Sequence, residues 1–212
     1  MQLLKTGNRE DFMVDMTGVQ SDGSAEFETL ISEAKSPVHC GIGINDPEIL
    51  IATPEGSLGG SEFRLPVTPP ACVRLALEDL KCFEVVESQF EHCGVTFANA
   101  VAIQPSNPAF SVRSGVTVLM GAPKSGLIEV TFKHPVRFVS GLVTSSRRTV
   151  LSARDRAGNA IAEDELPAPN LAGFNSRIPP NTQLMVQASN IYQVTFYAFD
   201  GQVIVDDFSF GF

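Results

Sequence analysis

From residue 71 onward, the chain consists of short segments in which apolar and polar residues alternate, separated by Gly, Pro and Asn. Alternation with a period of two places every second side chain on one face of a strand, so each segment predicts a β-strand with one buried face. The expected strands cover residues 73–77, 95–97, 116–119, 127–132, 136–143, 149–154, 183–186, 192–197 and 203–210. No helical pattern alternates with them, which excludes an α/β fold. Many short strands bounded by turn residues predict an antiparallel sandwich or barrel.

The first third of the chain has a different character. Residues 1–65 carry many acidic and glycine residues and only short apolar patches. A helix is expected over residues 24–34, and short strands are expected at 39–44 and 49–52. We expect residues 1–65 to be an extension that packs on a larger domain of residues 66–212, because they offer too little apolar surface to fold alone.

The charge balance excludes several classes of protein. The chain has 24 Asp and Glu against 15 Lys and Arg, a net charge of −9. Binding to nucleic acid needs clustered Lys and Arg that neutralise phosphates, so no such partner is expected. A transmembrane helix needs roughly 18 successive apolar residues, and the apolar runs here are far shorter. The first residues lack the apolar core of a secretory signal, so we expect a cytoplasmic protein unless an exported one has lost its leader.

Four cysteines, Cys40, Cys72, Cys82 and Cys93, leave the redox state open. An even number permits disulfides, and a Cys82–Cys93 pair would flank one loop. Free, half-buried thiols are the alternative, and they are common for cysteine. The spacing contains no Cys-x-x-Cys motif, so no structural zinc site is expected.

The sequence gives little support to catalysis. His92 beside Cys93 suggests a cysteine nucleophile, but cysteine enzymes place the base far away along the chain. No Gly-x-Ser-x-Gly elbow and no phosphate-binding glycine loop is present. A pair of carboxylates can act as acid and base in a glycosidase, so a hydrolase of glycosides or esters is the third of three hypotheses.

Several short motifs, taken in order, resemble a bacterial β-sandwich domain that is frequent in exported, PEP-CTERM-type proteins. The motifs are Leu77-Glu78-Asp79-Leu80, Gln89-Phe90, Gly94-Val95-Thr96-Phe97, the Asp155–Asn159 hairpin and Val205-Asp206-Asp207-Phe208. The resemblance spans residues 66–212 and implies a galactose-binding-like jelly roll, which often binds calcium and attaches to sugars or cell surfaces. The chain has no Trp and 2 Tyr, so an aromatic platform for a sugar ring would have to use Phe.

The sequence therefore predicts an all-β fold, an antiparallel jelly-roll sandwich with a small N-terminal extension. The leading hypothesis for its function is a non-catalytic module that binds carbohydrate or another cell-surface ligand and is stabilised by calcium. The second is a structural or assembly protein that uses a face of the sandwich to contact a protein partner. The expected ligand-binding residues are Tyr192 together with Arg147 and Arg148, which lie in a basic loop between two strands.

Four acidic residues form the expected calcium site. Glu78 and Asp79 follow the first strand of the jelly roll, and Asp206 and Asp207 lie in the last. The first and last strands of a jelly roll lie side by side, so these carboxylates are expected to converge on an ion that takes about six to eight oxygen ligands. Neighbouring strand residues point to opposite faces, so only one of each pair would face the ion. Solvated or turn-capping carboxylates are the alternative, and the acidic run at residues 163–165 is expected to be a solvated loop.

Calcium binding has a direct test in thermal unfolding. A ligand that binds only the native state raises the melting temperature by mass action. Calcium should therefore raise the melting temperature of the protein, and Asp206→Asn or Asp207→Asn should abolish the rise. A melting curve that calcium leaves unchanged would rule out the ion.

Overall fold

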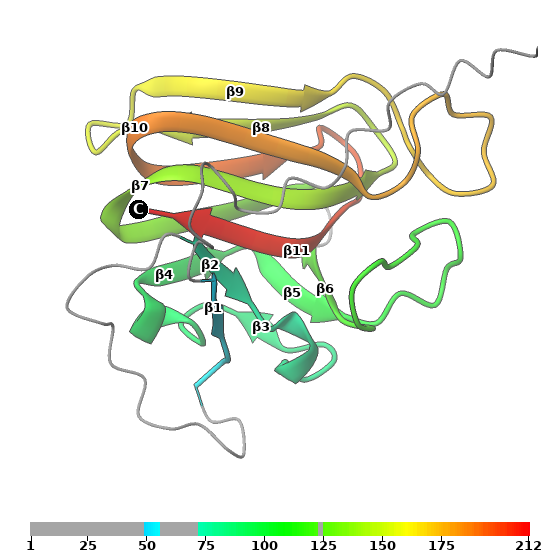
Figure 1. Cartoon of the computed structure of the whole chain (residues 1–212). Coiled ribbons are helices and arrows are strands. Elements are labelled where there is room, and N and C mark those ends of the chain that lie inside the picture. Colours follow the sequence, from blue (N-terminus) through cyan, green and yellow to red (C-terminus); the bar gives the residue numbers. More distant parts are fainter. Residues whose placement is uncertain (1–48, 56–71, 123–124) are drawn as a thin grey trace, which may run out of the picture. The chain divides into compact units, whose positions relative to one another are not determined.

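The computed structural model describes residues 49–55, 72–122 and 125–212, and strands dominate these residues (Figure 1). Two short 3-10 helices accompany them, η1 (Leu77–Asp79) and η2 (Glu91–Cys93). The strands are β1 (Ile49–Ala52), β2 (Cys72–Leu75), β3 (Val85–Val86), β4 (Val95–Ala98), β5 (Ala100–Ile103), β6 (Val118–Gly121), β7 (Leu127–Ser145), β8 (Thr149–Arg154), β9 (Ala160–Leu166), β10 (Thr182–Tyr197) and β11 (Val203–Gly211). The predicted all-β sandwich is confirmed. Within the described ranges no helix is long and apolar enough to cross a membrane.

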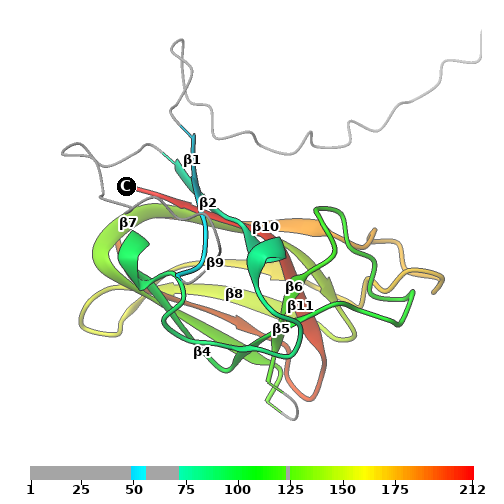
Figure 2. The same ribbon diagram turned by 90° about the horizontal axis from the view of Figure 1, so that it is seen from below.

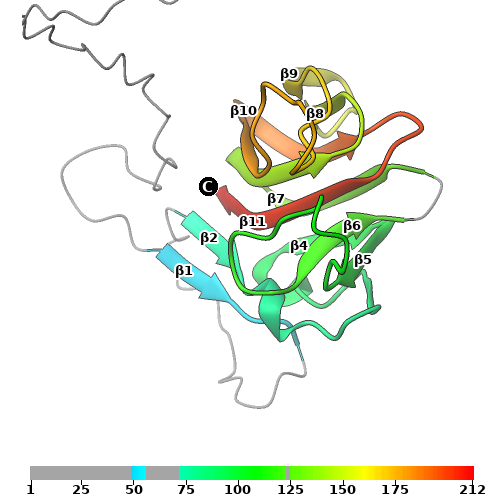
Figure 3. The same cartoon turned by 90° about the vertical axis from the view of Figure 1, so that its right-hand side faces the viewer.

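Two long strands, β7 and β10, run through both layers of the sandwich. The first half of β7 lies between β4 and the second half of β10, whereas its second half lies between β11 and the first half of β10. One layer therefore continues through β11, β6, β5 and β3, and the other contains β4, β8 and β9. Figure 3 shows β8 and β9 on one side of β7 and β11, and β5 and β6 on the other.

Each long strand bends where it passes between the layers. The register of β10 shifts on both sides of Ile191, and Asn190 has a φ of 66°. In β7 the sequence places Pro135 at the corresponding point, and proline, which lacks an N–H, is tolerated in strands at such irregularities. The sequence predicted two separate strands on either side of each bend. The structure joins each pair into one strand.

Aromatic rings from both layers fill the space between them. The fully buried Phe208 of β11 lies 5.6 Å from the ring of Phe97 in β4 and 6.3 Å from the ring of Phe196 in β10. Phe210 and Phe132 form a second contact across the layers, with ring centroids 5.1 Å apart. These rings bury large apolar areas in edge and tilted contacts, which hold the two layers together.

The last strand lies in the middle of its layer and pairs with β7, β6 and β2. Figure 2 shows β2 beside the C-terminal end of β11. The expected pairing of the first and last strands of the 66–212 domain is thus confirmed. β1 pairs with β2 in parallel, so residues 49–52 form a strand, as predicted.

The domain boundary near residue 65 stays a prediction, because residues 56–71 lie outside the described ranges. The helix expected at 24–34 and the strand expected at 39–44 also lie outside them.

Residues 163–165 are not the solvated loop that the sequence predicted. They belong to β9, which pairs with β8. The acids fit because β9 is an edge strand, where charged side chains are common. Asp164 also accepts a hydrogen bond of 2.9 Å from the backbone N–H of Met185.

The three cysteines in the described part of the chain differ in state and exposure, and Cys40 lies outside it. The suggested Cys82–Cys93 disulfide is wrong, because both residues are free thiols, one exposed and one buried. Cys72 is disulfide-bonded. Cys82 lies in the exposed turn before β3, whereas Cys93 is the last residue of η2 and packs into the core, so the two side chains occupy different environments.

The central ring provides a test of the packing. Phe208→Ala should lower the free energy of unfolding by about 3–5 kcal/mol, because it leaves a cavity between the layers. Phe199→Ala is a matched control, since this ring is 74% exposed and its loss should change stability by no more than about 0.5 kcal/mol. Urea unfolding of both variants measures the difference. Equal losses would show that the rings of β11 do not hold the layers together.

Candidate functional site

A cleft of about 360 Å³ opens beside the layer that contains β11, β6, β5 and β3. Strands β5, β6 and β11 supply Ile103, Met120 and Ile204, and the turns before β3 and β11 supply Phe83 and Gln202. The remaining wall comes from the loop that follows β5, through Gln104, Pro105, Ser106, Asn107 and Phe110. None of the ten lining side chains carries a charge. The cleft is therefore an apolar surface with amide groups along it.

Phe83 is held at the cleft in an uncommon backbone conformation. Its ring is 79% exposed, and its φ is 68°. A bulky residue with positive φ is a conformational outlier that costs about 1–3 kcal/mol. Its N–H donates to the carbonyl of Ala102 over 2.7 Å, and the N–H of Ala102 donates to the carbonyl of Glu84 over 2.8 Å. These bonds continue the β3–β5 pairing and keep the ring outside the core.

The loop of residues 104–117 is fixed on the sheet at several points. Phe110 and Ala109 pack with Ile204 and Val118 in a small apolar cluster of their own. The loop also joins residues 167–181: the N–H of Ala172 donates to the carbonyl of Ala109 over 2.9 Å. In the same region, the amide of Asn181 donates to Ser111 over 3.0 Å. The cleft wall that this loop forms is therefore built from ordered contacts.

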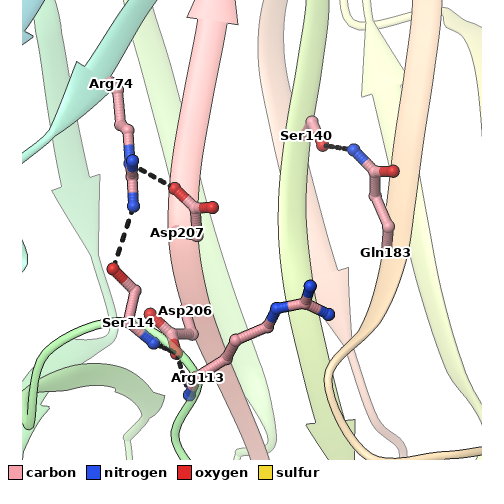
Figure 4. Close-up of polar contacts among 7 residues, drawn as sticks. All are labelled: Arg74, Arg113, Ser114, Ser140, Gln183, Asp206 and Asp207. Atoms are coloured by element: carbon pink, nitrogen blue, oxygen red, sulfur yellow. Dashed lines mark hydrogen bonds and ion pairs between the residues drawn. The ribbon is translucent and has the colours of Figure 1, made fainter. Parts of the chain in front are cut away.

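The two carboxylates of the last strand connect to this loop, Asp206 directly and Asp207 through Arg74 (Figure 4). Asp206 is 1% exposed, and its Oδ2 accepts hydrogen bonds from the N–H groups of Arg113 and Ser114 over 2.8 and 2.9 Å. Burial raises the pKa of Asp206, while these N–H donors act in the opposite direction. Asp207 forms an ion pair with Arg74, which also donates to the hydroxyl of Ser114 over 2.9 Å.

A β-bulge explains why neighbouring acids share one face. The register of β11 against β7 shifts between Asp206 and Ser209, and Asp207 has a φ of 50°. The extra residue changes the phase of the strand, so the core residues change from Val203 and Val205 to Phe208 and Phe210. The two acids nevertheless have different partners, and the expectation that only one of them faces a shared ion site stays a prediction. The change of phase can be read in the sequence. Val203 and Val205 lie at odd positions, whereas Phe208 and Phe210 lie at even positions.

The other two expected calcium ligands approach the same loop from η1. Glu78 and Asp79 are exposed, and a Cβ added to Gly115 would lie 3.4 Å from the Cβ of Glu78. As placed, however, the four acids do not form a calcium donor set, because backbone N–H groups and Arg74 occupy Asp206 and Asp207. Within the described part of the chain, no three His, Cys, Asp or Glu side chains gather to hold a metal. Calcium binding stays a prediction.

The expected ligand-binding residues lie at two different ends of β8. Arg147 and Arg148 are exposed in the turn between β7 and β8, and Arg148 pairs with Glu165. Tyr192 lies near the other end of β8, where the guanidinium carbon of Arg156 is 5.9 Å from its ring centre. The structure therefore does not bring Tyr192 to the two arginines.

A different tyrosine lies near the arginine turn. Tyr197 pairs in register with Val150, and its ring lies 6.2 Å from that of Phe199. The turn itself is bound to the segment before β11, because the N–H of Ser146 donates to the carbonyl of Gln202 over 2.9 Å. Alternation marks both tyrosines as strand residues, but it does not show which end of a neighbouring strand each one faces. Whether these residues bind a ligand stays a prediction.

Cys93 is not placed as a nucleophile. Burial raises the pKa of its thiol to about 12, so the reactive thiolate is nearly absent at neutral pH. The pairing of His92 with Cys93 that the sequence suggested therefore supplies no activated group.

The comparisons with known proteins give only distant likenesses. No family model matches the chain, and no curated protein matches it. The carbohydrate-binding module TmCBM61, solved with β-1,4-galactotriose, is 13% identical over 56% of this chain and 88% of its own, with a TM-score of 0.34. A DUF4465 family protein from Bacteroides caccae is 11% identical over 55% of this chain and 72% of its own, with a TM-score of 0.34.

One enzyme with an attached module is similar to the same extent. The CBM22-1–GH10 modules of the Clostridium thermocellum xylanase Xyn10B, complexed with xylohexaose, are 11% identical over 62% of this chain and 27% of their own, with a TM-score of 0.34. Likenesses of this size are partial, and no function follows from them. Membership of the PEP-CTERM-type family stays a prediction.

The two free thiols should differ in reactivity. Iodoacetamide at pH 8 should modify Cys82 and spare Cys93, because a thiol with a pKa of about 12 is only roughly one part in ten thousand ionised there. Mass spectrometry of the peptides measures the modification. Denaturant is the control, since unfolding should make the two thiols react alike. Rapid labelling of Cys93 in the native protein would contradict its burial.

Proposed function

We propose that the protein is a non-catalytic module that binds a neutral carbohydrate in the cleft beside Phe83. The exposed ring of Phe83 carries this proposal. A sugar ring has an apolar face of C–H groups that packs flat against an aromatic ring, and such contacts supply much of the binding energy of sugar sites. Exposed phenylalanine rings are costly in water, and this one is kept exposed on a strained backbone.

The amide side chains of the cleft provide the polar half of such a site. A planar amide has both a donor and an acceptor, which suits the paired hydroxyls of a sugar. Within the described residues, the side chains of Gln104 and Gln202 make no hydrogen bond. Asn107 uses its oxygen to accept from the N–H of Ala109 over 3.0 Å, which leaves its NH₂ group to donate. These groups are therefore ready to bind a ligand.

The lack of charge in the cleft favours a neutral sugar. No lining residue is acidic or basic, and the chain as a whole carries a net charge of −9. A uronate or sulfated sugar would meet no cation in the cleft and would be repelled by the surrounding field. An uncharged oligosaccharide avoids both costs.

The lining also supports the non-catalytic part of the proposal. Glycoside hydrolysis uses a pair of carboxylic acids on the two sides of the bond that breaks. The cleft is lined by apolar, amide, hydroxyl and proline side chains, which bind sugars but do not transfer protons at neutral pH.

A second candidate function is protein assembly. Tyr197 and Phe199 are 41% and 74% exposed and lie against each other at the turn before β11. Exposed aromatic residues are enriched in protein–protein interfaces. A stable oligomer in light scattering that Phe199→Ala dissociates, with no binding of sugar, would favour this function.

Removing the ring at position 83 tests the proposed function. We expect the protein to bind members of a panel of neutral β-1,4-linked gluco-, galacto- and xylo-oligosaccharides, measured by calorimetry. Phe83→Ala should weaken binding about 5–30-fold, which corresponds to the loss of about 1–2 kcal/mol of stacking. Phe83→Gly should weaken it as much while relieving the strain of the positive φ.

Phe174 provides the matched control. It is a phenylalanine that is 67% exposed in the loop between β9 and β10, and it does not line the cleft. Phe174→Ala should therefore leave the affinity unchanged. Equal losses in Phe83→Ala and Phe174→Ala, or no binding of any panel member by the wild-type protein, would reject the cleft as a neutral-sugar site.

A further inference from the structure

We propose that Asp206 is a positioning residue of the cleft, because its buried carboxylate fixes the loop of residues 104–117 that forms one wall. This inference rests on the proposed function for its effect on ligand binding. It rests on geometry alone for its effect on the loop.

The carboxylate is placed as an acceptor for two consecutive backbone N–H groups. Those of Arg113 and Ser114 donate to one oxygen, Oδ2, over 2.8 and 2.9 Å (Figure 4). Hydrogen bonds to an ionised carboxylate are stronger than those between neutral groups. Because Asp206 is 1% exposed, water does not compete for these donors. The backbone of the loop is thus held at this point by the Asp206 carboxylate.

The same strand face connects the anchor to the cleft. Ile204 and Asp206 are two residues apart on β11, so their side chains leave the strand on the same side. Ile204 lines the cleft and packs on Phe110 of the loop. Asp206 binds the loop a few residues further along, at Arg113. Two neighbouring side chains on one face of β11 therefore hold the same loop: Ile204 packs on its apolar part, and Asp206 accepts hydrogen bonds from its backbone.

Arg74 makes a second connection to the same point. Its guanidinium donates to the Ser114 hydroxyl over 2.9 Å and forms an ion pair with Asp207. The two acids of the bulge thus both serve this loop, one directly and one through Arg74. This assigns a role to the pair that the sequence had marked as metal ligands.

The variants separate the acceptor from the charge. Asp206→Ala removes the acceptor and leaves the N–H groups of Arg113 and Ser114 without this partner. Asp206→Asn keeps an acceptor oxygen in the same place, so it should hold the loop. Arg74→Ala removes only the second connection and should give an intermediate effect.

Trypsin reports the state of the loop without any ligand, because Arg113 is exposed within it. Native-state cleavage after Arg113 should be at least about tenfold faster in Asp206→Ala than in the wild type and unchanged in Asp206→Asn. Amide hydrogen exchange of residues 104–114 should accelerate in the same variant. Affinity for the neutral β-1,4-linked oligosaccharide panel should fall at least about fivefold in Asp206→Ala and be retained in Asp206→Asn.

Asp155 provides the matched control. Its carboxylate also accepts from two backbone N–H groups, of Ala157 and Asn159, each over 2.9 Å, but in the β8–β9 hairpin. Asp155→Ala should therefore change neither cleavage after Arg113 nor sugar affinity.

The outcomes distinguish the two proposals. Unchanged cleavage and exchange in Asp206→Ala would overturn the anchoring role whatever the ligand is. Faster cleavage with unchanged sugar affinity would overturn the positioning role. Faster cleavage in Asp206→Ala, with no panel member bound by the wild type, would support the anchor and reject the proposed function. If Asp206→Ala does not fold, amide exchange in the wild-type protein decides, because the N–H groups of Arg113 and Ser114 that donate to Asp206 should exchange slowly. Exchange of both at the rate of an unstructured peptide would overturn the anchor.

Discussion

The burial of the two phenylalanine rings of β11 between the layers is the interaction on which the rest of the structure depends. Phe208 and Phe210 contact rings from β4, β7 and β10, so one strand connects the two layers through its inner face. Its outer face is then free to organise loops, because β11 lies in the middle of its layer and cannot move without moving β2, β6 and β7. A loop fixed to this strand is therefore attached to the middle of its layer.

The bulge at Asp206 and Asp207 follows from the same packing. Gly141, on the partner strand, lies opposite the shift in register, and a Cβ there would come within 2.7 Å of a methyl group of Val205. The absent side chain leaves room for the strands to approach at the irregularity. The bulge turns two neighbouring acids to one face while the rings of the strand stay inside. The contacts between the outer face of β11 and the loop therefore depend on the bulge, which interrupts the alternation of buried and exposed residues along the strand.

Alternation in the sequence predicted most strands, because burial of one face is a local signal with a period of two. The pairing of β2 with β11 was expected only from the resemblance to a jelly roll. Alternation failed where that signal is interrupted. The three acids of β9 led to the prediction of a loop where the structure has an edge strand. The bends in β7 and β10 interrupt the alternation, so each strand was predicted as two separate strands. The candidate site was harder to predict. Phe83 gives no local signal, since only the β3–β5 contact fixes its exposed ring. Alternation also does not give strand order, so it could not show that Tyr192 lies at the other end of β8 from Arg147 and Arg148.

The electrostatics of Asp206 show why an acid in this place is not explained by stability alone. Desolvation raises its pKa in the folded protein despite the N–H groups that it accepts. A folded-state pKa above the unfolded value means that the folded state binds more protons between the two pKa values, so the free energy of unfolding falls as pH rises through this range. At neutral pH the ionised side chain thus lowers stability relative to its protonated form. What the carboxylate contributes in return is the position of the loop. It is a strong acceptor for the adjacent N–H groups of Arg113 and Ser114, in the loop that forms one wall of the cleft.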